Sequence, residues 1–347
     1  MYLKDLEELK VIADSIPNTR MMSCFKVSAL ITLNMRCELI MINKNLDEHP
    51  YKLVSGLIRD AILDLTKLKE ISYIEGARDL LISDKGSLEE NHHKLFQKLW
   101  TNFSPDDYKT RIERFTFRLK INGLGDGWLK GLKCIDFGCG HGNFEHALIR
   151  SGASYAYGVD YGRDNIKYAI KARNEIGVDP CQIEFKEESV YKVSKGDNEF
   201  DFAIQNGVFH HLENQDAAYK EVFRVLKPGG WFWVYTEGSA GIVHNLFEAS
   251  AYILREIPHD YIISHLDYLN IKTEKRYHLG DLLNAIYKQE TWDSITNRLS
   301  KLGFGNFRRL VGGFPTDAEH DVTTEDLYVK EKYGEGDLRL LAQKLEL

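Results

Sequence analysis

Three glycines at alternate positions mark the stretch of this chain best suited to chemistry. Residues 134–142 read Cys-Ile-Asp-Phe-Gly-Cys-Gly-His-Gly, with an acid, Asp136, near the end of a short apolar run. A backbone without Cβ atoms lets a ligand lie directly against it, and the helical segment that Asn143 opens presents its N-terminus to the same place. The stretch therefore predicts a ligand-binding loop with a carboxylate beside it.

Polar residues also end two later apolar segments. Gly158-Val-Asp160 closes the next strand-like run and is followed by Tyr161, and Gln205-Asn206-Gly207 closes another. An acid at the end of the strand after a glycine loop can accept hydrogen bonds from both ribose hydroxyls of a nucleotide. These residues predict that the ligand carries a ribose.

Two histidines follow the second of these segments, in Asn206-Gly-Val-Phe-His210-His211. Histidine is the usual general base near neutral pH, so either ring could accept a proton or contact a substrate. Adjacent residues on a strand or helix point in different directions, so both are not expected to face one substrate. The alternative is that one or both brace the loop by hydrogen bonding.

The elements around these residues alternate between strand and helix over residues 132–236. Strands are expected over 132–137, 155–161, 182–186, 200–205 and 231–236, with helices over 143–150, 165–176 and 216–226. Such alternation indicates parallel βαβ units in an α/β, doubly wound sheet, with ligands at the carboxyl edge of the strands. Residues 307–311 and 338–342 are expected to close the sheet.

Taken in order, the glycine loop, Asp160, the segment 200–207 and Leu226-Lys-Pro-Gly-Gly-Trp231 closely resemble class I S-adenosylmethionine-dependent methyltransferases over about residues 130–237. The resemblance implies a seven-stranded Rossmann-like sheet and S-adenosyl-L-methionine as cofactor. It implies that the acid at 160 binds the ribose and the acid at 136 helps to hold the amino group. The cofactor-binding residues expected from it are Asp136, Gly138, Cys139, Gly140, Gly142, Asn143, Asp160, Tyr161, Glu188, Ser189, Gln205, Asn206 and Gly207.

One position departs from that family. Its third strand often ends in Gly-Asp, whose acid bonds the adenine amino group, whereas this chain has Lys186-Glu-Glu-Ser-Val-Tyr191. Glu188 or Ser189 could take this role, and the register between them is open. The alternative for Glu188 is a solvated charge at a strand end.

The chain divides into four expected regions: a mostly helical region at 1–110, the cofactor-binding core at 111–240, a helical lid insertion at 241–290 and a completion of the sheet at 291–347. The first region is expected to serve packing or dimerisation, or to cover one side of the site. The insertion would lie above the same edge as the glycine loop, as lids do.

Composition narrows the function. The net charge is −7, which argues against a nucleic acid as partner. The sequence contains no run of about 18 apolar residues, which is the length that a membrane-spanning helix requires. An odd count of five cysteines without a Cys-x-x-Cys pair suits a reducing cytoplasm.

These observations predict methyl transfer by SN2 displacement to an oxygen or nitrogen atom of a small molecule such as a sugar, an amino compound or a secondary-metabolite precursor. His210 and His211 are the candidate catalytic residues, and no metal site is assigned. Methylation of a protein or peptide, and a non-catalytic cofactor-binding scaffold, are the alternatives. A homodimer through the N-terminal helices is expected.

Overall fold

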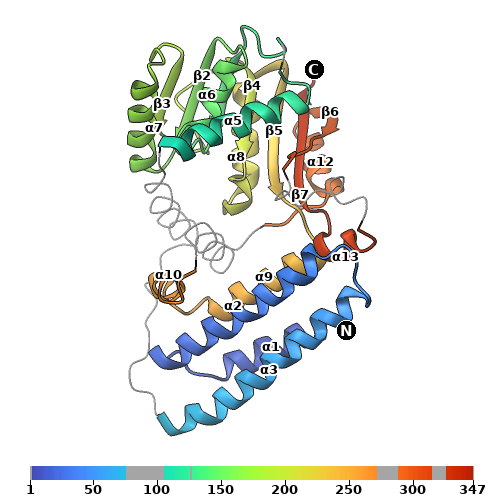
Figure 1. Cartoon of the computed structure of the whole chain (residues 1–347). Helices are drawn as coiled ribbons and strands as arrows, with labels where there is room; N and C mark the ends of the chain where they lie inside the picture. Colours follow the sequence, from blue (N-terminus) through green and yellow to red (C-terminus); the bar gives the residue numbers. More distant parts are fainter. Residues whose placement is uncertain (1, 76–104, 126, 272–287, 315–325, 347) are drawn as a thin grey trace. The chain divides into compact units, whose positions relative to one another are not determined.

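The computed structural model describes residues 2–75, 105–125, 127–271, 288–314 and 326–346 (Figure 1). The chain forms two compact units. The helical unit comprises residues 1–92, 239–287 and 323–335, and the sheet unit comprises residues 93–238, 288–322 and 336–347.

The sheet unit is built on seven strands in the order β3-β2-β1-β4-β5-β7-β6. The strands are β1 (Lys133–Phe137), β2 (Tyr155–Asp160), β3 (Ile183–Glu187), β4 (Phe200–Asn206), β5 (Leu226–Glu237), β6 (Phe304–Arg309) and β7 (Asp337–Lys344). The first five are parallel, and β7 pairs antiparallel with both β5 and β6. This confirms the predicted α/β fold and its two closing strands.

The register brings the carboxyl ends of the central strands together. Asp136 of β1 pairs with Gly158 of β2 and with Ile204 of β4, and Asp160 pairs with Glu187 of β3. The chain order reverses between β1 and β4, which is where open α/β sheets bind their ligands. The glycine loop follows β1 at this point.

Helices cover both faces of this sheet (Figure 1). They are α5 (Pro105–Ile121), α6 (Asn143–Arg150), α7 (Arg163–Ile176), η1 (Phe209–His211), α8 (Gln215–Val225) and α12 (Trp292–Lys301). Alternate residues of β1 supply the two cores: Cys134 packs with α5, α6 and α7, whereas Ile135 packs with α8 and α12. The sheet is therefore apolar on both faces, as parallel sheets are.

β5 begins earlier than the sequence predicted. The sequence predicted a helix that ends at residue 226 and a strand that begins at residue 231, but the strand begins at Leu226 and contains Lys227-Pro-Gly-Gly230. Phe200 pairs with Leu226 and Phe202 with Trp231, so the four residues between form an irregularity in the strand. Gly229 has a positive φ of 77° there, which suits glycine.

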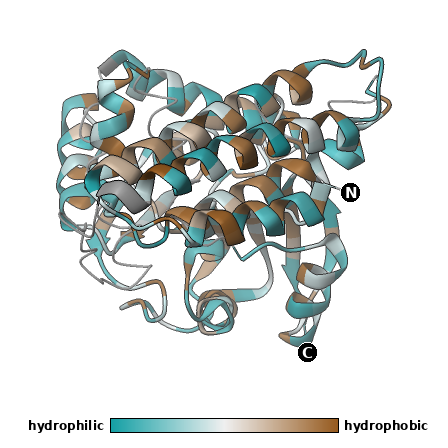
Figure 2. Ribbon diagram, turned by 90° about the horizontal axis from the view of Figure 1, so that it is seen from below, coloured by the Kyte–Doolittle hydropathy of each residue, from teal (hydrophilic) through white to brown (hydrophobic). Residues whose placement is uncertain are grey.

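The helical unit has one core shared by its larger helices. Its helices are α1 (Tyr2–Asp14), α2 (Arg20–Ile42), α3 (Pro50–Glu75), α9 (Gly241–Leu254), α10 (His259–Tyr268) and α13 (Val329–Tyr333). Figure 2 shows apolar and polar residues interspersed along these helices. Residues 241–271 of the expected lid thus fold with the N-terminal helices, whereas residues 76–104 and 272–287 lie outside the described residues. None of the helices described is both long and apolar enough to cross a bilayer.

Candidate functional site

The glycine loop is fixed to the neighbouring strand. The backbone N–H groups of Gly138 and Cys139 both donate to the Val159 carbonyl of β2, at 2.8 and 3.0 Å, and Gly142 N–H donates to the Cys139 carbonyl at 2.9 Å. Three left-handed residues, with φ of 87° at Gly138, 53° at Gly140 and 79° at Gly142, make this tight path. The loop then enters α6.

The three glycines meet different surroundings. A Cβ at Gly138 would lie 2.5 Å from Cγ2 of Val208, and one at Gly142 would lie 2.3 Å from Cζ of Phe185. A Cβ at Gly140 would meet no atom of the described residues within 4 Å. The outer two glycines are therefore required by packing within the sheet unit, and Gly140 borders open space in which a ligand can approach the backbone.

Asp160 lies at the end of β2 and binds the same loop. Its Oδ2 accepts from Gly140 N–H at 3.0 Å, and its Oδ1 accepts from Gly162 N–H at 2.7 Å and from Asn165 Nδ2 at 3.1 Å. The carboxylate is thereby held in one orientation with lone pairs to spare. Tyr161 follows with 66 % of its surface exposed.

Three acidic side chains gather at the loop in buried positions: Asp136, Glu145 and Asp160. Among the described residues, Oδ1 of Asp136 and both carboxyl oxygens of Glu145 have no hydrogen-bond partner. Burial, with Asp160 adding to it, raises the pKa of Asp136 to about 8. Burial and then Asp136 hold the pKa of Glu145 well above its ordinary value. A cationic ligand would stabilise the ionised form of both carboxyl groups.

Cys139 lies among these acids with its thiol 3.8 Å from the Gly140 carbonyl oxygen. Burial, and then Glu145, raise its thiol pKa well above the usual value, so the sulfur stays protonated. Cys139 therefore contributes a small, uncharged side chain to the loop.

Helix α5 forms hydrogen bonds with the glycine loop and with the start of α6, a contact that was not predicted from the sequence. The Tyr108 hydroxyl donates to the His141 carbonyl at 2.8 Å, and Asn143 Nδ2 donates to the Tyr108 carbonyl at 3.3 Å. The His141 ring stacks on Tyr168 of α7 with centroids 4.0 Å apart. Burial, and then the charge of Arg111, lower the His141 pKa to about 3, so this ring is neutral.

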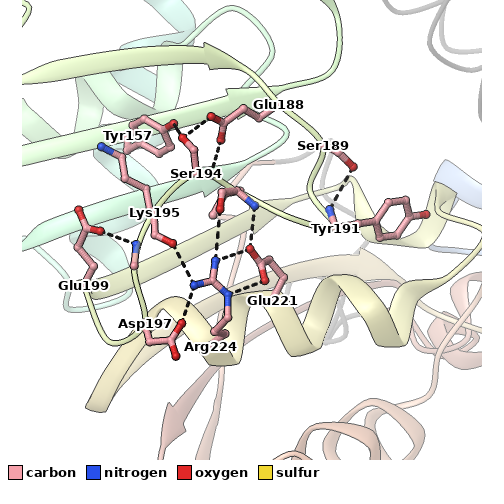
Figure 3. Close-up of polar contacts among 12 residues, drawn as sticks. Tyr157, Glu188, Ser189, Tyr191, Ser194, Lys195, Asp197, Glu199, Glu221 and Arg224 are labelled. Carbon is pink, nitrogen blue, oxygen red and sulfur yellow. Dashed lines mark hydrogen bonds and ion pairs between the residues drawn. The ribbon is translucent and has the colours of Figure 1, made fainter.

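Residues after β3 form a tightly bonded segment (Figure 3). Glu188 accepts from the backbone N–H of Ser194 at 3.0 Å and from its hydroxyl at 2.5 Å, and the Ser189 hydroxyl accepts from Tyr191 N–H at 3.3 Å. Arg224 of α8 anchors the far end of the segment, donating to Asp197 at 2.7 Å. Both predicted adenine contacts thus use their side chains locally, and their role in cofactor binding stays a prediction.

The segment after β4 is braced by Gln205. Its Nε2 donates to the Tyr235 carbonyl at 2.9 Å, and its Oε1 accepts from the N–H groups of Val208 and Phe209, each at 3.2 Å. Both ends of this amide therefore shape the loop. Asn206 accepts from the Trp233 indole at 3.3 Å, and Gly207, with φ of 80°, packs under the Tyr235 ring.

The two histidines occupy different environments in η1. His210 is buried, and its Nδ1 lies 3.3 Å from Glu237 N–H and 3.5 Å from the Thr236 hydroxyl. Since a backbone N–H can only donate, Nδ1 accepts, and the neutral ring carries its proton on Nε2. His211 is half-buried, with its ring centroid 4.0 Å from that of His210.

Glu145 was also missed from the sequence, although one signal pointed to it. Gly158 lies in the middle of β2, and a Cβ there would be 2.3 Å from Oε1 of Glu145. A glycine inside a strand often marks a close approach of another group.

The family model described as "Methyltransferase domain" matches residues 135–234. The chain is 31 % identical over 106 residues to methyltransferase phqN of Penicillium fellutanum, covering 30 % of this chain and 32 % of that one. It is 28 % identical over 189 residues to the mitochondrial ubiquinone biosynthesis O-methyltransferase of Dictyostelium discoideum, covering 50 % and 58 %. The chain thus spans between a third and three fifths of the length of these relatives.

Among solved structures, the chain is similar to a 1,6-didemethyltoxoflavin-N1-methyltransferase of Burkholderia thailandensis. The identity is 13 %, the TM-score is 0.43, and the match covers 77 % of this chain and 95 % of the other. A likeness at this level bears on neither substrate nor partner.

Proposed function

We propose that the chain, of which residues 135–234 match a methyltransferase domain, is an S-adenosylmethionine-dependent methyltransferase that transfers a methyl group to an oxygen or nitrogen atom of a small molecule. The observation that carries the proposal is the backbone of Gly140, which borders open space beside Asp160 and the buried acids. The O-methyltransferase relative supports a small-molecule acceptor.

The residues at the loop fit the cofactor. When bound, S-adenosylmethionine supplies an electrophilic methyl group on a positively charged sulfur. Gly138, Gly140 and Asn143 would border its methionine part, and the remaining lone pairs of Asp160 would accept from the ribose hydroxyls. Asp136 would face the amino group, since a buried carboxyl without a partner favours a cation.

The chain's main contribution is alignment, because a cationic sulfur is already a good leaving group. Holding two reactants in line contributes about 7 kcal/mol or more to such reactions. The Gln205 amide and the Tyr108 hydroxyl fix the two segments that would face the reacting groups, each through bonds to backbone. The protein thus meets the requirement for rigid placement.

We assign different parts to the two histidines. His210 accepts a backbone N–H through Nδ1, so it positions the loop and can offer only its Nε2–H to a substrate. His211 is half-buried and is the proposed base for an acceptor that must lose a proton.

The decisive experiment measures binding of S-adenosylmethionine and S-adenosylhomocysteine by calorimetry. Asp160→Ala should weaken both at least tenfold, because hydrogen bonds to a charged group contribute about 1.5–3 kcal/mol. Asp164→Ala, which removes an exposed acid four residues on, is the matched control and should bind normally. Absence of binding to the unaltered protein would refute the proposal, and unchanged affinity in Asp160→Ala would refute the ribose assignment.

Two further parts of the proposal concern the helical unit. A homodimer is supported by exposed apolar residues at helical spacing on α2, namely Met21, Phe25, Met35, Leu39 and Ile42. Light scattering on unaltered protein and Leu39→Glu would test it, a monomeric mass for both being the contrary result. The lid role of residues 241–290 would be tested by proteolysis with and without the cofactor, protection being the expected outcome.

A further inference from the structure

We propose that Asp136 and Glu145 form a buried acid pair beneath the glycine loop that gives up a proton when the cationic methyl donor binds. The inference rests on the proposed function and deepens it. Both S-adenosylmethionine and S-adenosylhomocysteine bring an ammonium group to the pair, and only S-adenosylmethionine adds a sulfonium. The site therefore favours S-adenosylmethionine by the additional proton release that the sulfonium causes.

The placement of Glu145 is the first step. It lies in the first turn of α6 with none of its surface exposed. Its Oε1 lies so close to the Cα of Gly158 that an added Cβ would be 2.3 Å away, and the Cys139 Cβ would be 2.9 Å from the same position. The carboxyl group therefore lies against β2, directly under the loop.

The second step is that the pair lacks partners. Three carboxyl oxygens have no hydrogen-bond partner within the part of the chain that the structure describes: both oxygens of Glu145 and Oδ1 of Asp136. An ionised carboxylate buried in this way is costly, and the group takes up a proton instead. The raised pKa values of both acids agree with this reading.

The groups that face the pair do not offset its charge. They are Cys134 on β1, Cys139 in the loop, Asp160 on β2 and Tyr108 on α5, all neutral or acidic. None of these four groups supplies a positive charge, and no cationic side chain of the described residues is among the groups that shift the pKa of either acid. The positive charge is left for a ligand to supply.

The proton balance follows. A nearby opposite charge lowers the pKa of a carboxyl by about 1–3 units. The pKa of Asp136 is about 8, and that shift lowers it to about 7 or below. The O–H bond of the carboxyl breaks, its electron pair stays on oxygen as the carboxylate, and the proton passes to solvent. No other bond changes.

The test counts protons released on binding to the full chain at pH 7. Calorimetric titrations with S-adenosylmethionine are run in phosphate and in Tris, whose ionisation enthalpies differ, and repeated with S-adenosylhomocysteine. A carboxyl with a pKa near 8 is about 90 % protonated at pH 7, and one with a pKa lowered by 1–3 units is between about 50 % and 1 % protonated. Release should therefore be about 0.4–0.9 proton for the sulfonium and smaller for the thioether.

Variants assign the protons. The Asp136→Asn and Glu145→Gln double variant should release fewer than about 0.2 proton per binding event, whereas Asp164→Asn, at an exposed acid of α7, should match the unaltered protein. If the double variant released as many protons on binding as the unaltered protein, the inference would be overturned.

A second readout covers a double variant that fails to fold or bind. For the unaltered protein, the ratio of the two dissociation constants should shift toward S-adenosylmethionine as pH rises from 6 to 9. A ratio independent of pH, or binding without proton release, overturns this inference alone. Absence of binding by both compounds would instead overturn the proposed function.

Discussion

Gly140→Ala should separate ligand binding from folding. Gly140 has a φ of 53° and no atom within 4 Å of an added Cβ. Alanine in the left-handed region costs about 1–2 kcal/mol. The free energy of unfolding of the sheet unit should fall by that amount and no more, because the new methyl group meets no atom of the residues that the structure describes.

Gly177 offers a matched control. It ends α7 with a φ of 82°, and an added Cβ there also meets nothing within 4 Å. Gly177→Ala should therefore lose the same 1–2 kcal/mol for the same backbone reason. The two positions differ in one respect, since Gly140 borders the proposed ligand and Gly177 does not.

Binding should then distinguish the two variants. A methyl group in space needed by another group costs about 1–3 kcal/mol, which corresponds to a loss of about five- to 150-fold in affinity. Calorimetry with S-adenosylhomocysteine, beside thermal unfolding of both variants, gives the two quantities. Equal affinity of Gly140→Ala and Gly177→Ala would refute the placement of the cofactor against this backbone.

Three other perturbations address the rest of the site. His211→Ala should lower turnover tenfold or more with cofactor affinity kept, whereas His210→Ala, which removes the acceptor for Glu237 N–H, should also lower thermal stability; full turnover in both would exclude histidine as the base. Gly158→Ala places a Cβ within 3 Å of three side chains and should lose about 1–3 kcal/mol more than Gly196→Ala, whose Cβ meets only one atom, at 3.6 Å; equal urea midpoints would contradict this. The pKa of His141 in the folded protein lies below its unfolded value of about 6.5, so the neutral ring's contribution to the free energy of unfolding is complete above pH 6.5 and is lost as the pH falls. In urea unfolding, the decrease in free energy of unfolding from pH 7 to pH 5 should therefore be smaller for His141→Phe than for the unaltered protein.

The sheet could be predicted from the sequence because each strand carries its own signal. Residues 132–137 are mostly apolar, which is typical of a strand buried on both faces, and β1 spans Lys133–Phe137. Gly177 marked the end of α7 in the same local way. The alternation of strands and helices then predicts parallel βαβ units in an open sheet.

The bracing of the site could not be predicted, because it joins residues that are distant in sequence. Tyr108 and the His141 carbonyl are 33 positions apart, and the Gln205 amide and the Tyr235 carbonyl are 30 apart. Nothing in local composition separates a tyrosine that clamps a loop from one that packs in a core. The partner of residues 241–271 was hidden for the same reason, since an apolar helix does not specify which helix it packs against.

The glycine motif shows how one pattern can hold two kinds of constraint. The sequence presents Gly138, Gly140 and Gly142 as equivalent, yet Val208 and Phe185 fill the space beside the outer two. Loss of cofactor binding on substituting either outer glycine would therefore report damaged packing as readily as a damaged site. Only the middle position lets a change in affinity be read as contact with the ligand, because there the chain itself leaves room for a side chain.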